Sequence, residues 1–98
     1  YARSVVRHYS GRGYGVQRIR QELYRRGVPR EFWEDAMEER SDPEEQVTAF
    51  LNQKMRGHEN DPKQLKRAAD ALLRRGFRWE EIRAGLNRYG ANIEEESL

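Results

Sequence analysis

Only a few side chains in this sequence have the chemistry of a catalytic or metal-binding centre. The chain has two histidines, His8 and His58, and no cysteine, so it lacks both a thiol nucleophile and a thiolate metal site. Paired glutamates such as Glu80 and Glu81 are neighbours in sequence and therefore point to different sides of a helix. We interpret these pairs as solvated charges, and we predict a protein that is not an enzyme and has no cofactor.

Two further patterns resemble binding motifs but are incomplete. His58, Glu59 and Asp61 lie close together in a polar loop, where they would form a flexible and under-liganded metal site. The stretch GRGYG, residues 11–15, lacks the flanking strand and the Lys-Ser/Thr pair of a phosphate-binding loop. We therefore predict no metal site and no nucleotide site.

The basic residues are more informative, because they are segregated along the chain. The 98 residues carry 19 Lys and Arg against 17 Asp and Glu, a net charge of only +2. Residues 1–30 nevertheless balance at +7, residues 31–46 at −7, residues 47–93 at +5 and residues 94–96 at −3. Such blocks favour a partner that binds in one orientation, although solvent-facing helices produce the same pattern without any partner.

One basic motif occurs twice. ELYRRGV at residues 22–28 returns 49 positions later as ALLRRGF at residues 71–77. In each copy a glycine, Gly27 or Gly76, follows the last apolar residue of a helical pattern, where a left-handed residue commonly ends a helix. The two arginines before each glycine fall in the last turn, where the helix dipole favours positive charge. We interpret Gly27 and Gly76 as structural helix caps.

Helical geometry separates the cations around this motif. At 100° per residue, Arg18, Glu22 and Arg25 cluster opposite the apolar stripe of residues 16–23, so all three are predicted to face solvent. Arg26 lies near the apolar edge, where its stem can pack and its head can pair with an acid. The outward cations of both copies are our candidates for binding a partner or DNA: Arg18, Arg25, Lys66, Arg67 and Arg74.

Six stretches with apolar residues at helical spacing position these candidates. The stripes lie within residues 2–9, 16–23, 32–37, 47–55, 65–73 and 79–89, and glycine-containing turns follow most of them. Asp42-Pro43 and Asp61-Pro62 each combine an N-cap with a proline at the first helical position, so they predict helix starts. The pattern predicts an all-α, elongated array of two three-helix repeats, residues 1–41 and 42–91, with a frayed acidic tail at residues 92–98.

Composition agrees with a folded but thin-cored helical protein. Only 36% of the residues are hydrophobic and 37% are charged, yet the apolar residues are periodic. No apolar run approaches the ~20 residues of a membrane span, and no secretory signal is visible. We expect a cytoplasmic monomer. The chain begins without Met, from which we expect a fragment of a longer protein.

At this point the sequence resembles the RecX family, the regulators of the RecA recombinase. RIRQELYRRGV at residues 18–28 is similar to the family pattern R-I-x-x-E-L-x-x-x-G-V. The second copy matches it in Lys66, Leu72, Arg75, Gly76 and Phe77, and the resemblance extends over roughly residues 1–90. One departure is Arg78, which stands where the family often has a Ser or Asp as the next N-cap. The resemblance implies the later two of three tandem three-helix repeats.

The family implies a function that the residues alone do not reveal. It implies a non-enzymatic protein that binds the RecA filament on single-stranded DNA, within its groove. There it would inhibit strand exchange, ATP hydrolysis and co-protease activity, and so modulate DNA repair and the SOS response. The alternatives are a helix-turn-helix-like DNA-binding protein, or a helical scaffold for another partner. Acids in the third helix disfavour DNA readout there, whereas weak DNA contact through the basic helices stays compatible with filament binding.

Overall fold

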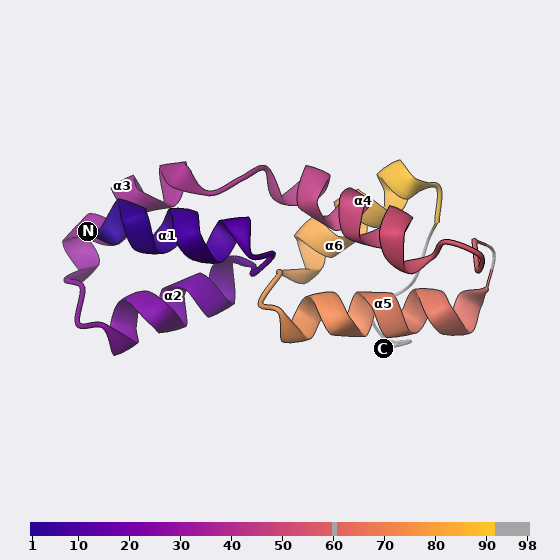
Figure 1. Cartoon of the computed structure of the whole chain (residues 1–98), viewed down its shortest axis with the longest axis horizontal. Coiled ribbons are helices and arrows are strands. Elements are labelled where there is room, and N and C mark those ends of the chain that lie inside the picture. Colours follow the sequence, from indigo (N-terminus) through magenta and orange to yellow (C-terminus); the bar gives the residue numbers. More distant parts are fainter. Residues whose placement is uncertain (60, 92–98) are drawn as a thin grey trace.

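The computed structural model describes residues 1–59 and 61–91, and all regular elements within these ranges are helices (Figure 1). The molecule is elongated, measuring 43 × 23 × 17 Å, so the predicted all-α, elongated fold is confirmed. The elements are α1 (Ala2–Gly11), α2 (Val16–Arg25), η1 (Arg30–Phe32), α3 (Trp33–Ala36), η2 (Met37–Glu39), α4 (Pro43–Lys54), α5 (Pro62–Arg74) and α6 (Trp79–Tyr89), where η marks a 3₁₀ turn.

The helices form two bundles with separate hydrophobic cores, joined end to end (Figure 1). The first bundle comprises α1 to η2, and its core is Val5, Val6, Ile19, Leu23, Trp33 and Ala36. The second bundle comprises α4 to α6, and its core is Val47, Leu51, Met55, Ala68, Ala69, Leu72, Phe77, Ile82 and Leu86. A domain boundary between residues 41 and 42 stays a prediction, and the predicted acidic tail lies outside the described residues.

The predicted helix starts at the two Asp-Pro pairs are confirmed. The Asp42 carboxylate accepts a hydrogen bond from the Glu44 amide at 3.0 Å, and Pro43 occupies the first turn. Asp61 accepts in the same way from the Lys63 amide at 3.0 Å, with Pro62 beside it. Each aspartate therefore satisfies a backbone N–H that the helix itself leaves unpaired.

The Arg-Arg-Gly motifs end α2 and α5 with the same backbone geometry. Gly27 and Gly76 have φ angles of +71° and +98°, the left-handed region that glycine adopts without steric cost. The amide after each glycine bonds back into the helix, Val28 to the Leu23 carbonyl at 3.0 Å and Phe77 to the Leu72 carbonyl at 3.1 Å. This pattern is a Schellman cap, which leaves the carbonyls of the cap residues themselves free to bond elsewhere.

The predicted third helix is present, but it is not a regular α-helix, and Phe32 does not share its buried apolar stripe. The segment consists of a 3₁₀ turn, four α-helical residues and a second 3₁₀ turn. The tight entry from Val28-Pro29 is held by the Trp33 indole N–H, which donates to the Val28 carbonyl at 2.8 Å. Because 3₁₀ turns have three residues per turn, Phe32 rotates out of the stripe and is 53% exposed.

The two bundles meet at a joint made largely of backbone. The amides of Gly15 and Gln17, at the start of α2, donate to the carbonyls of Arg75 and Gly76 at 2.8 and 2.9 Å. These bonds satisfy the start of α2, which has no side-chain cap of its own. The joint therefore places the end of α5 against the start of α2, and the two helices follow one long edge of the molecule (Figure 1).

Polar side chains complete the joint on the other side. Ser10, which is buried at the end of α1, accepts a bond from the Ser41 amide on its hydroxyl at 2.9 Å. The Gln46 side chain donates to the Ser10 carbonyl at 2.8 Å. Arg40, in the segment between the bundles, makes two hydrogen bonds to the Glu81 carboxylate at 2.8 and 3.1 Å.

Candidate partner-binding surface

The predicted outward cations lie on α2 and α5, the two helices that meet at the joint. Arg25 and Arg74 are well exposed, with 77% and 68% of their side chains accessible. Lys66 and Arg67 are exposed on α5 as well. Arg74 makes an ion pair with Asp70 one turn earlier, which leaves the guanidinium at the surface. We call Arg25, Lys66, Arg67 and Arg74 the basic row.

Arg18 does not share this exposure, which corrects its assignment as a fully outward residue. Its side chain is only 40% exposed, and its guanidinium lies 5.0 Å from the ring centre of Tyr14. Its backbone faces Gly76 across the joint, where a Cβ on that glycine would lie 2.5 Å from the Arg18 amide nitrogen. The helical wheel could not reveal this, because the second bundle covers that side of α2. Arg18 therefore belongs to the joint.

Glu22, also predicted to face solvent, is buried. Only 3% of the residue is accessible, and three arginine side chains enclose it. Arg18, Arg25 and Arg26 hold guanidinium nitrogens 3.5, 3.6 and 3.6 Å from its carboxylate oxygens. Glu22 lies on the flank of the apolar stripe, and the arginine stems shield it from water. One carboxylate thus anchors three cations and leaves this part of α2 positively charged.

Arg26 pairs with an acid as predicted, and it also contacts two tyrosines. It donates to the hydroxyls of Tyr1 and Tyr9 at 3.1 and 3.0 Å, in addition to its contact with Glu22. The hydrogen bonds to Tyr1 and Tyr9 raise the pKa of Arg26 above its ordinary value. Arg75, its counterpart in the second bundle, lies over the Phe50 ring at 5.3 Å. Both arginines therefore rest on an aromatic ring of their own bundle, which leaves the basic row as the outward set.

A basic and aromatic cluster on the first bundle was missed in the sequence. Arg20 and Arg30 lie over the ring of Trp33, at 5.4 and 5.0 Å from its centre. Beside them Tyr24 is 74% exposed, and a shallow pocket of about 380 Å³ is lined by Gln17, Arg20, Gln21, Tyr24, Arg25, Arg30 and Trp33. Guanidinium groups that alternate with aromatic faces suit phosphates and stacked bases. The exposed tyrosine in a basic helix was the available signal.

Part of the acidic block of residues 31–46 is neutralised within the first bundle. Arg3 contacts Asp35 at 2.8 Å, and Arg7 contacts Glu39 at 2.8 Å, so arginines of α1 neutralise acids of α3 and η2. The hydrogen bond to Asp35 and the charge of Asp35 raise the pKa of Arg3. Some of the segregated charges therefore meet within the first bundle, whereas α2 and α5 each carry more Lys and Arg than acid.

Within residues 1–59 and 61–91, no three His, Asp or Glu side chains come together as a metal site. In the same ranges, the helices are too short or too polar to cross a lipid bilayer.

Comparisons with known proteins support the family resemblance. Residues 1–37 match a family model described as RecX, second three-helix domain. The regulatory protein RecX of Pseudomonas putida (strain GB-1) is 37% identical over 79 residues, which is 79% of this chain and 51% of that protein. The chain thus spans about half the length of this curated relative. No solved structure showed significant similarity. On the family-model match and this identity, the chain belongs to the RecX family.

Proposed function

We propose that this chain regulates the RecA recombinase by binding the RecA filament on single-stranded DNA, and that it inhibits recombination, ATP hydrolysis and co-protease activity. Family membership is the observation that carries this proposal. The protein would act by binding and not by catalysis, because the surface proposed for the contact consists of cations and aromatic rings. An elongated array with a fixed joint suits a partner that is itself a repeating filament.

The basic row is the surface that we propose for this contact. Arg25 is its member on the first bundle, while Arg67 and Arg74 are among its members on the second. Because the joint bonds the end of α5 to the start of α2, the cations of both helices keep a constant spacing. Such a row would attract either DNA phosphates or acidic protein surface, and its contribution should weaken as salt increases.

Direct DNA contact has separate support from the cluster of Arg20, Trp33 and Arg30. Trp33 itself is buried, but the exposed Tyr24 ring beside this cluster suits weak, sequence-independent contact with single-stranded DNA. A base would stack on Tyr24 and a phosphate would pair with Arg20 or Arg30. Sequence reading in the major groove has less support. The candidate reading helix of the first bundle, α3, has only four residues and carries Glu34 and Asp35. We therefore propose DNA contact as an accessory to filament binding.

The decisive experiment measures RecA ATP hydrolysis on single-stranded DNA in the presence of this chain. We expect the double variant Arg67→Glu/Arg74→Glu to need about tenfold more protein for half-inhibition, because two favourable charge contacts become repulsive. The matched control Arg83→Glu/Arg88→Glu reverses two exposed arginines on α6, outside the basic row, and should inhibit as the parent does. Equal loss in both double variants, with unchanged melting temperatures, would reduce the proposal to a general charge effect.

A second arm separates filament binding from plain DNA binding. Binding to naked single-stranded DNA, followed at low and high salt, should be weak, and the substitution Tyr24→Ala should weaken it further. If the chain binds naked DNA as tightly as it binds the RecA filament, the DNA-binding alternative is correct. If it binds neither, the chain is a scaffold for a different partner.

A further inference from the structure

Two arginines of the first bundle have no counter-charge within the described residues. The guanidinium groups of Arg20 and Arg30 lie 5.4 and 5.0 Å from the centre of the same Trp33 ring. Neither arginine makes an ion pair or a side-chain hydrogen bond in the part of the chain that the structure describes. Because two like charges held at one ring repel each other, this arrangement favours the binding of an anion from outside the chain.

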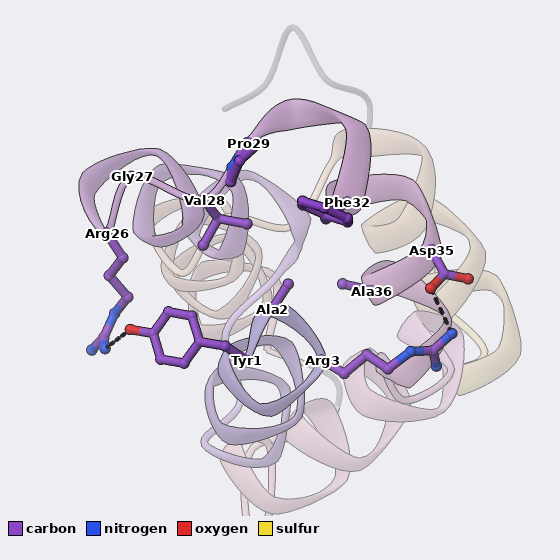
Figure 2. Close-up of a pocket in the computed structure, with 10 residues that line it drawn as sticks. All are labelled: Tyr1, Ala2, Arg3, Arg26, Gly27, Val28, Pro29, Phe32, Asp35 and Ala36. Carbon is purple, nitrogen blue, oxygen red and sulfur yellow. Dashed lines mark hydrogen bonds and ion pairs between the residues drawn. The ribbon is translucent and has the colours of Figure 1, made fainter.

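A pocket at the outer end of the same bundle shows the opposite arrangement, because both of its arginines already have partners (Figure 2). Arg3 contacts the Asp35 carboxylate at 2.8 Å. Arg26 donates to the Tyr1 hydroxyl at 3.1 Å. By contrast, the pocket beside Trp33, which we call the α2–η1 pocket, is lined by three arginines and no acid. Of these two pockets, the α2–η1 pocket is therefore the one with positive charge available for a ligand.

The outer face of α2 adds an aromatic ring and two amides to the α2–η1 pocket. Gln17, Gln21 and Tyr24 are spaced by four and three positions, so they share one face of the helix, and all three are exposed. Tyr24 is 74% exposed, and no other ring of the described residues packs against it. An exposed tyrosine ring offers a flat face to a nucleobase, and glutamine amides can donate and accept hydrogen bonds at the base edge.

An unpaired nucleotide fits this combination of groups, whereas a paired one does not. In duplex DNA each base is stacked between its neighbours, so its flat face is closed to a side chain unless the base leaves the stack. In a single strand the face of the base is open, and it can stack on an aromatic side chain. The cations of the basic row, in contrast, would meet phosphates, which both forms of DNA carry. Stacking on Tyr24 is therefore the contact that distinguishes the two forms.

We propose that the α2–η1 pocket is a site for one unpaired nucleotide and that it gives this chain its selectivity for single strands. The base would stack on the Tyr24 ring, and the phosphate would bond to Arg20 and Arg30. This inference rests on the proposed function, because it assigns strand selectivity to one site within the DNA contact described there. The basic row attracts any DNA, and the α2–η1 pocket responds to the presence of an unpaired base.

The test measures the dissociation constants of the 98-residue chain for three DNA ligands by fluorescence anisotropy. The ligands are a single strand of about fifteen nucleotides, the duplex of the same sequence, and an abasic strand of the same length that keeps the sugar-phosphate backbone. We expect the parent to bind the single strand about tenfold more tightly than the abasic strand. Tyr24→Ala should remove this difference, and it should leave the affinities for the abasic strand and the duplex within about twofold of the parent.

Three further variants separate the ring from the charges. Tyr24→Phe keeps the aromatic face, so it should bind all three ligands as the parent does. Tyr1→Ala removes a tyrosine that is 76% exposed but lies outside the α2–η1 pocket, and it should also bind as the parent does. Arg30→Gln should weaken the binding of the single strand and the abasic strand by the same factor, because both carry the phosphate.

The outcomes distinguish this inference from the proposed function when inhibition of RecA ATP hydrolysis is measured in parallel. Equal affinity of Tyr24→Ala and the parent for the single strand overturns the inference, and so does an equal loss for all three ligands. A parent that inhibits RecA but does not bind the naked single strand also overturns the inference, and it leaves the proposed function in place. Strand selectivity that depends on Tyr24, in a chain that does not inhibit RecA, supports the inference and overturns the proposed function.

Discussion

The pair of Arg40 and Glu81 connects the segment between the bundles to α6, and we predict that it makes a large contribution to stability. Its two hydrogen bonds measure 2.8 and 3.1 Å, and the side chains are only 12% and 18% exposed. A surface ion pair contributes about 0–1 kcal/mol, whereas breaking a buried pair costs about 3–5 kcal/mol. Because this pair is mostly buried, we expect each single substitution to cost a free energy of unfolding between these limits, about 2–3 kcal/mol.

The experiment is a double-mutant cycle with Arg40→Met, Glu81→Gln and the combined variant. Glutamine keeps an oxygen that can accept from the Arg78 amide, so the start of α6 is preserved while the charge is lost. Each single variant should melt about 10–20 °C lower, at roughly 4–8 °C per kcal/mol for a chain of this size. The Arg40 Nε is buried and lacks a hydrogen-bond partner among the described residues. The combined variant should therefore lose less stability than the sum of the two single losses.

Urea or thermal unfolding gives the free energies, and Arg7→Met provides the matched control. Arg7 also bonds to a glutamate at 2.8 Å, but its side chain is 65% exposed, so its loss should cost no more than about 1 kcal/mol. Single losses below about 0.5 kcal/mol, or a coupling energy near zero, would show that the bridge behaves like an exposed pair. The joint would then depend on its backbone bonds and on the hydrogen bonds of Ser10 and Gln46.

Two further predictions concern carboxylates. Glu22→Ala should destabilise the first bundle by about 1–2 kcal/mol, because three arginines lose the buried charge they share. The control Glu45→Ala, on an exposed face of α4, should cost less than about 0.5 kcal/mol, and equal melting curves for the two variants would contradict the enclosure of Glu22. Burial raises the pKa of Glu81, but hydrogen bonds from Arg40 and the Arg78 amide, with their charges, leave that pKa below its ordinary value. The ionised Glu81 carboxylate therefore contributes its full stabilisation of the fold above the unfolded pKa of about 4.3, and this contribution is lost as pH falls through the folded pKa. The Glu81→Gln variant should consequently lose less stability than the parent between pH 6 and pH 3.

Local chemistry explains what could be predicted from the sequence. The starts at Asp42 and Asp61 depend on residues within one helical turn, so their pattern is readable without tertiary structure. The apolar stripes likewise identified most of the two cores, because a helix that packs on one side needs one apolar face. The broken third helix was not predictable in this way, since the bond from Trp33 to Val28 decides its geometry.

The candidate site was predicted less completely, because its geometry depends on contacts between distant residues. Arg25 and Arg74 lie on the surface as the helical wheel predicts, but their role in binding stays a prediction. Arg18 and Glu22 differ from expectation because the second bundle covers one and arginine stems enclose the other. Arg20 and Arg30 are neighbours because both lie over the ring of Trp33. Their spacing in the sequence does not predict this contact between α2 and η1.

The backbone character of the joint has a consequence for how such proteins diversify. At Gly15 and Gly76 the two bundles contact each other through backbone amides and carbonyls, groups that every residue except proline supplies, and through the absence of a side chain. Substitutions of neighbouring side chains, other than those of Ser10, Arg40, Gln46 and Glu81, which also bond across the joint, therefore leave these backbone contacts in place. Lys66, Arg67 and Arg25 lie away from these bonds, so a change in any of them alters the basic row without altering the geometry of the joint.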